Sequence, residues 1–114
     1  MTPPLERHVY ESGVRLLKLA GCKVYRLSQP RRTMQTPGLP DVWIFGPPGC
    51  FAWWEAKRPG GRLRPEQKEF RAMCLARGIP HVVGGVESVQ ALLVEWGLGE
   101  QGAAGFVLKP QRAA

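Results

Sequence analysis

The chain has 114 residues, 44% of them hydrophobic, with a formal net charge of +7 and a pI near 9.9. This length predicts one domain with a single core, and the excess of Lys and Arg favours nucleic acid as the partner. Three isolated cysteines with no CxxC pair suggest no zinc framework and indicate free thiols. Because there is no signal peptide and no long apolar run, we expect a soluble cytoplasmic protein with no membrane partner.

The first predicted element is a helix over about residues 5–20, followed by Gly21, which is typical of a helix end. Its apolar stripe has helical spacing and consists of Leu5, Val9, Leu16, Leu17 and Ala20. Glu6 lies at the edge of this stripe and Glu11 on the polar side. Glu6 is therefore the better candidate to point toward a site, and the alternative is a first-turn acid favoured by the helix dipole.

A strand is predicted at about residues 22–27, where apolar and polar residues alternate. Residues 28–37 contain Arg31 and Arg32 among prolines and polar residues, which predicts a loop. We expect this loop to pass beside the functional site, where the two arginines bind DNA phosphates. A solvated pair of charges is the alternative.

The next two apolar runs flank the segment Gly-Pro-Pro-Gly-Cys at 46–50, which predicts a β-hairpin over about residues 41–57. A symmetric loop pairs Phe45 with Phe51 and Trp43 with Trp53, and it places Asp41 opposite residue 55. Because side chains alternate between the two faces of a strand, Glu55, Lys57 and Asp41 then share one face.

Two opposed carboxylates, Asp41 and Glu55, repel each other unless they share a proton or a cation lies between them. Mg²⁺ is commonly held by one or two carboxylates together with substrate phosphate. Lys57 adds a positive group, so the three residues make a site for hydrolysing a phosphate ester. The alternative is a surface ion pair between Glu55 and Lys57, with Asp41 a turn residue after Pro40.

After the hairpin, a Gly-containing turn carries Arg58, Arg62 and Arg64, which we expect to bind DNA backbone phosphates. A second helix is predicted at about residues 65–77, opened by Pro65. Gln67 shares the inward face of this helix, where it orients a carboxylate or binds a metal-bound water. A capping glutamine at the third helical position is the alternative.

A strand at residues 79–83 and a helix at 86–96 complete the predicted domain, which covers residues 1–97. The Gly-, Ala- and Gln-rich segment 98–114 predicts a loosely ordered tail, apart from a short strand at 106–108.

The combination of G-L-P-D at 38–41, E-A-K at 55–57, K-R-P-G-G at 57–61 and P-E-Q at 65–67 resembles the virus-type replication–repair nuclease (VRR-NUC) family of the PD-(D/E)XK nuclease superfamily. The resemblance covers about residues 5–96. It implies an α/β fold with a restriction-endonuclease-like core in the order α-β-β-β-α-β-α, a small mixed sheet flanked by helices.

The resemblance also implies roles for individual residues. Asp41 and Glu55 become ligands of Mg²⁺ or Mn²⁺, with the backbone carbonyl of Ala56 as a third. Lys57 positions or helps to deprotonate the attacking water. Gln67 supports the site, and Glu6 matches the family's acid in the first helix.

From the residues and the resemblance together, we expect a metal-dependent DNA endonuclease of phage or bacterial replication, repair or recombination. It should select branched or flapped DNA by shape rather than by sequence, and family members suggest a homodimer. The alternative from another class is a non-catalytic nucleic-acid-binding module with the same fold.

Overall fold

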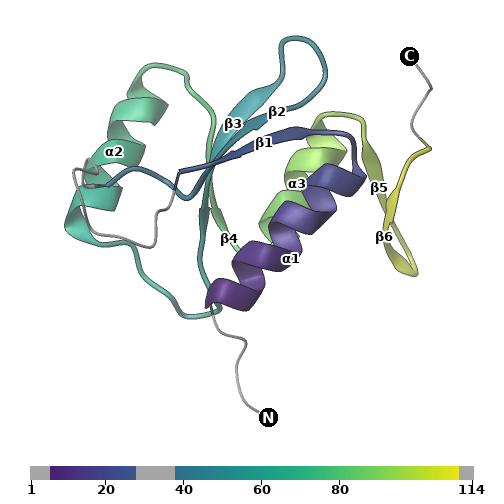
Figure 1. Ribbon diagram of the computed structural model, residues 1–114, viewed down its shortest axis with the longest axis horizontal. Coiled ribbons are helices and arrows are strands. Elements are labelled where there is room, and N and C mark those ends of the chain that lie inside the picture. Colours follow the sequence, from purple (N-terminus) through teal and green to yellow (C-terminus); the bar gives the residue numbers. More distant parts are fainter. Residues whose placement is uncertain (1–5, 28–37, 111–114) are drawn as a thin grey trace.

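The computed structural model describes residues 6–27 and 38–110, and its elements follow the predicted order (Figure 1). They are α1 (Glu6–Leu19), β1 (Lys23–Arg26), β2 (Val42–Phe45), β3 (Phe51–Ala56), α2 (Pro65–Ala76), β4 (His81–Gly84), α3 (Val86–Glu95), β5 (Gly99–Gly102) and β6 (Gly105–Leu108). β1 to β4 form one sheet in that order, antiparallel except for the parallel pair β3–β4. The predicted mixed sheet flanked by helices is confirmed. In the described ranges no helix has both the length and the apolar character needed to cross a membrane.

The β2–β3 hairpin has the predicted register, with Phe45 opposite Phe51 and Trp43 opposite Trp53. Its loop closes through backbone hydrogen bonds from Gly46 to Cys50 and from Cys50 to Pro47, both 2.8 Å long. Odd-numbered residues of the hairpin therefore share one face of the sheet, and even-numbered residues share the other.

The even-numbered face is the core face, covered by α1 and α3. Trp54 at its centre is fully buried, and its indole N–H lies 3.2 Å from Ser88 Oγ and 3.3 Å from the Gly84 carbonyl oxygen. Gly13 of α1 packs directly on this indole, because a Cβ at residue 13 would lie only 2.1 Å from Trp54 Cη2. The close packing of α1 on the sheet thus fixes the strand that carries Glu55.

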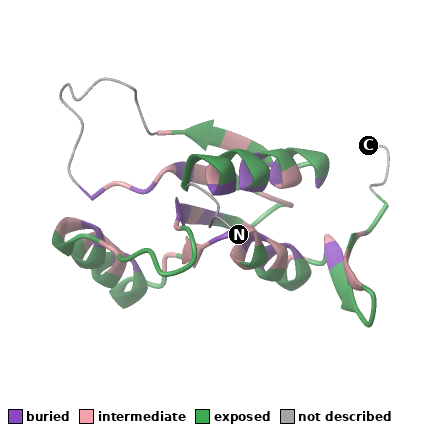
Figure 2. Cartoon of the chain, turned by 90° about the horizontal axis from the view of Figure 1, so that it is seen from below, coloured by how far each residue is buried: buried purple, intermediate pink, exposed green. Residues whose placement is uncertain are grey.

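The odd-numbered face is covered in part by α2, whose Phe70 meets Trp53 at a ring-centroid distance of 5.5 Å. The rest of this face carries half-buried and exposed rings, which we call the aromatic face: Tyr25, Trp43, Phe45, Phe51 and Trp53. Figure 1 shows α2 on one side of the sheet and α1 with α3 on the other, and Figure 2 shows that α2 itself is mostly exposed.

Part of the segment 98–114, which we expected to be a loosely ordered tail, forms regular secondary structure. β5 and β6 form a two-stranded hairpin, and the predicted strand at 106–108 lies within β6. Leu98, Phe106 and Leu108 pack against the core, and the Phe106 ring lies over Gly99 with no room for a Cβ there. These apolar contacts hold the hairpin against the core, which the Gly-rich composition of the segment does not predict. The domain boundary at residue 97 stays a prediction.

Candidate active site

Asp41 is positioned at the start of β2 by contacts on both sides. Its carbonyl oxygen accepts a 2.8 Å hydrogen bond from the Leu27 amide, and its Oδ2 accepts a 2.9 Å hydrogen bond from the Ala56 amide. Gly38 lets the preceding turn pass against α2, because a Cβ there would lie 2.4 Å from the Glu66 carbonyl oxygen. Only a glycine fits this approach, and its φ of +90° also favours glycine.

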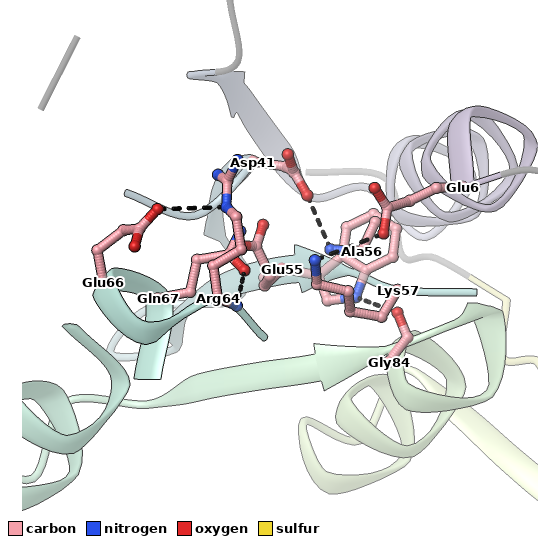
Figure 3. A network of polar contacts seen from close by, with 10 residues as sticks. Glu6, Asp41, Glu55, Ala56, Lys57, Arg64, Glu66, Gln67 and Gly84 are labelled. Carbon is pink, nitrogen blue, oxygen red and sulfur yellow. Dashed lines mark hydrogen bonds and ion pairs between the residues drawn. The ribbon is translucent and has the colours of Figure 1, made fainter. Parts of the chain in front are cut away.

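Glu55 lies on β3 beside Asp41, as the predicted register requires (Figure 3). The Glu55 residue is only 3% exposed. Burial, together with the interaction with the neighbouring Asp41 carboxyl and its charge, raises the pKa of the Glu55 carboxyl to about 9. The Asp41 carboxyl thus disfavours a negative charge on Glu55, and a cation bound between the two would relieve this repulsion.

Gln67 joins α2 to this pair through both ends of its amide. Nε2 donates a hydrogen bond to Glu55 Oε1, and Oε1 accepts a 2.8 Å hydrogen bond from the Arg64 amide. The two alternatives that the sequence left open for Gln67 are therefore combined in one side chain: it caps the helix and it orients the carboxylate.

Lys57 and Glu6 complete the site from opposite elements. The Lys57 amide donates a 3.0 Å hydrogen bond to the Gly84 carbonyl of β4, which fixes the backbone where the side chain leaves β3. Its Nζ lies 3.6 Å from Glu6 Oε1, with the Lys57 side chain 13% exposed and that of Glu6 52% exposed. Glu6 is a first-turn residue of α1 that also reaches the site, and its charge contributes to the raised pKa of Glu55.

The predicted phosphate-binding arginines are only partly placed. Arg58 and Arg62 are exposed on the turn between β3 and α2, and Arg64 is exposed at the start of α2, where its Nε lies 3.4 Å from Glu66 Oε1. Arg31 and Arg32 lie outside the described residues.

The donor set suits a hard divalent cation but does not enclose one. Asp41 and Glu55 offer carboxylate oxygens, which Mg²⁺ and Mn²⁺ prefer. Within 6–27 and 38–110, no group of three or more His, Cys, Asp or Glu side chains is placed to hold a metal ion. An ion here would therefore complete its coordination with water and, once DNA is bound, with substrate phosphate, as is usual for Mg²⁺. The Ala56 amide is bonded to Asp41, and the ligand role of its carbonyl stays a prediction.

Two contacts near the site were not predicted. His81 is buried, and Arg71 Nη1 lies 3.0 Å from its Nδ1 and donates to its carbonyl oxygen at 2.6 Å. The aromatic face was also missed, although its signal is present in the alternating aromatic residues of 43–45 and 51–53.

Comparison with known proteins adds one finding. A solved structure described as a VRR_NUC domain is similar to this chain, with a TM-score of 0.62 and 26% sequence identity over 79% of this chain and 94% of that structure. The resemblance expected from the motifs is thereby confirmed. No protein-family model and no curated protein matches the chain.

Proposed function

We propose that this chain, which has the fold of a VRR-NUC nuclease domain, is a Mg²⁺- or Mn²⁺-dependent endonuclease that hydrolyses phosphodiester bonds of DNA. The observation that carries the proposal is the buried Glu55 carboxyl, which lies beside Asp41 and accepts a hydrogen bond from the Gln67 amide on the sheet face that Lys57 shares (Figure 3). A binding module gains nothing from two adjacent acids, because acids repel phosphate. A hydrolase needs them to hold a cation at the scissile group.

Each residue has a defined task in this reaction. Asp41 and Glu55 hold the cation, which when bound supplies Lewis-acid polarisation of the scissile phosphate. Lys57 donates from Nζ to the attacking water or to the charge that develops on the phosphate oxygens.

Two further residues position these groups. Glu6 holds the Lys57 ammonium at the rim of the site, at 3.6 Å. Gln67 fixes the Glu55 carboxyl for ligation. Hydrogen bonds of this kind keep the ligands of a metal site in one orientation.

The substrate side of the proposal rests on charge. Exposed Arg58, Arg62 and Arg64 suit backbone phosphates, contacts that carry affinity without reading sequence. We therefore propose selection of branched or flapped DNA by shape, in phage or bacterial replication or repair. A homodimer that places two such sites on one branched substrate is part of the same proposal.

The test is a cleavage panel of linear, flapped and four-way DNA with Mg²⁺, Mn²⁺ or EDTA. We expect the wild type to cleave with either metal and not with EDTA. The Asp41→Ala variant should lose cleavage while keeping or improving DNA binding in EDTA, because a negative charge is removed. A protein that binds DNA but cleaves none of these substrates with either metal is the non-catalytic binding module instead.

A further inference from the structure

The aromatic face lies on the same side of the sheet as the candidate active site. Phe51, Trp53 and Glu55 are alternate residues of β3, so their side chains project from one face at steps of about 7 Å. On the neighbouring strand β2, Phe45 lies beside Phe51 and Trp43 lies beside Trp53, so each pair forms a row across the two strands. The row that holds the two tryptophans is therefore the immediate neighbour of the row that holds Glu55.

The rings are held in place by one another and are still accessible. The Trp43 centroid lies 4.4 Å from that of Trp53, 5.3 Å from that of Phe45 and 5.5 Å from that of Phe51. Tyr25 is nevertheless 49% exposed, Phe45 41% and Phe51 37%. Rings that are already ordered lose little freedom when a flat ligand stacks on them, which lowers the cost of binding.

Basic groups border this face at both edges of the sheet. Lys23 of β1 is exposed and lies opposite Phe45 in the strand register. At the other edge, the Arg71 guanidinium is bonded to His81, which lies opposite Trp53. Apolar rings between basic groups match a ligand that has flat apolar parts on an anionic backbone.

A second copy of the chain fits this face less well. The three most exposed rings offer on the order of 300 Å² of accessible surface, given about 150–250 Å² for an aromatic side chain, whereas a standard interface takes about 800 Å² from each partner. A single-stranded nucleic acid needs only one ring for each base.

We propose that the aromatic face binds unpaired bases of a single-stranded segment of the DNA substrate, stacked on its rings next to the site of cleavage. Glu69 of α2 lines a cavity beside Phe70 and repels phosphates there. The unpaired strand therefore extends from the active site toward β1. The inference rests on the proposed nuclease function and assigns the binding of an unpaired arm of the substrate to the aromatic face.

The test compares the affinities of a short oligothymidylate and of a duplex of equal length, measured by fluorescence anisotropy in EDTA. We expect Phe45→Ala and Tyr25→Ala each to weaken single-strand binding by about 5- to 100-fold, and to leave duplex binding unchanged. The ring-preserving Phe45→Trp should bind as the wild type does. Leu19→Ala, which trims a 65% exposed residue of α1, is the matched control. Oligothymidylate should also quench tryptophan fluorescence in the wild type.

Two results would overturn the inference: equal losses of single-strand and duplex affinity, or unchanged single-strand affinity in both alanine variants. Sedimentation that finds a wild-type dimer dissociated by Phe45→Ala would overturn it too, and would assign the face to a second copy. Cleavage of linear, flapped and four-way DNA with Mg²⁺ or Mn²⁺ is measured on the same proteins. If the wild type cleaves DNA and the alanine variants keep their single-strand affinity, only the inference fails. If the wild type cleaves no DNA, the nuclease proposal fails.

Discussion

Gln67 connects the stability of α2 to the chemistry of Glu55 through its two hydrogen bonds. Replacing it with alanine leaves the buried Glu55 carboxyl without this partner. Because support of this kind orients metal ligands, Gln67→Ala should lower metal affinity or cleavage by about 10- to 100-fold. The comparison is with Gln90→Ala, which removes the same side chain from α3. Equal activity in both variants would show that Gln67 does not support the site.

His81 makes the stability of the protein depend on pH. Burial and the charge of the Arg71 guanidinium together lower the pKa of this histidine to about 4. In the unfolded chain the pKa of His81 is near 6.5. The stability that depends on a neutral His81 is therefore fully present above pH 6.5 and is lost as the pH falls through the folded pKa.

We expect the free energy of unfolding to fall by up to about 3 kcal/mol between pH 6.5 and 4 through this one group. Chemical denaturation over that range should show a smaller fall in His81→Asn than in the wild type. His8→Asn, which changes an exposed histidine, should behave like the wild type. Identical pH profiles for all three proteins would refute this account of His81.

At the scale of elements, the contact between α1 and β3 depends on Gly13. An alanine there gains up to about 1 kcal/mol in helix propensity but forces an overlap with Trp54, and overpacking of this kind costs about 1–3 kcal/mol. The indole has little freedom to retreat, since it is bonded to Ser88 and Gly84.

Gly13→Ala should therefore lower the midpoint of thermal unfolding. Ser12→Ala, which changes the preceding and exposed residue of α1, should not. A Gly13→Ala protein more stable than the wild type would show that the helix shifts freely on the sheet.

The β2–β3 hairpin was predictable because its two strands alternate around a Pro-Gly loop, and that pattern sets the register and places Asp41 opposite Glu55. Hairpin β5–β6 was only half predicted, because residues 99–102 have no β-branched or aromatic side chain. Its order comes from tertiary contacts of Leu98 and Phe106. The double role of Gln67 was equally hidden, since helical spacing gives the direction of a side chain but not the partners at both ends of its amide.

The whole molecule carries a net charge of +7, so its DNA affinity should fall steeply with salt. Arg62 is exposed on the turn beside the site, and Arg62→Ala should reduce the slope of log affinity against log salt by about 0.9. Arg77→Ala, at the far end of α2, should leave the slope unchanged. A slope that is shallow in the wild type, or equal in all three, would contradict phosphate binding by this turn.

The measurement that tests the central claim most directly is calorimetric titration of Mn²⁺ into the wild type, Glu55→Gln and Glu11→Gln. Glu11 is the matched control, because it is an acid of α1 whose carboxylate lies 3.3 Å from Arg26, away from the site. The account predicts binding of Mn²⁺ by the wild type and by Glu11→Gln, and loss of that binding in Glu55→Gln. Unchanged binding in Glu55→Gln, or no binding by the wild type, would contradict it.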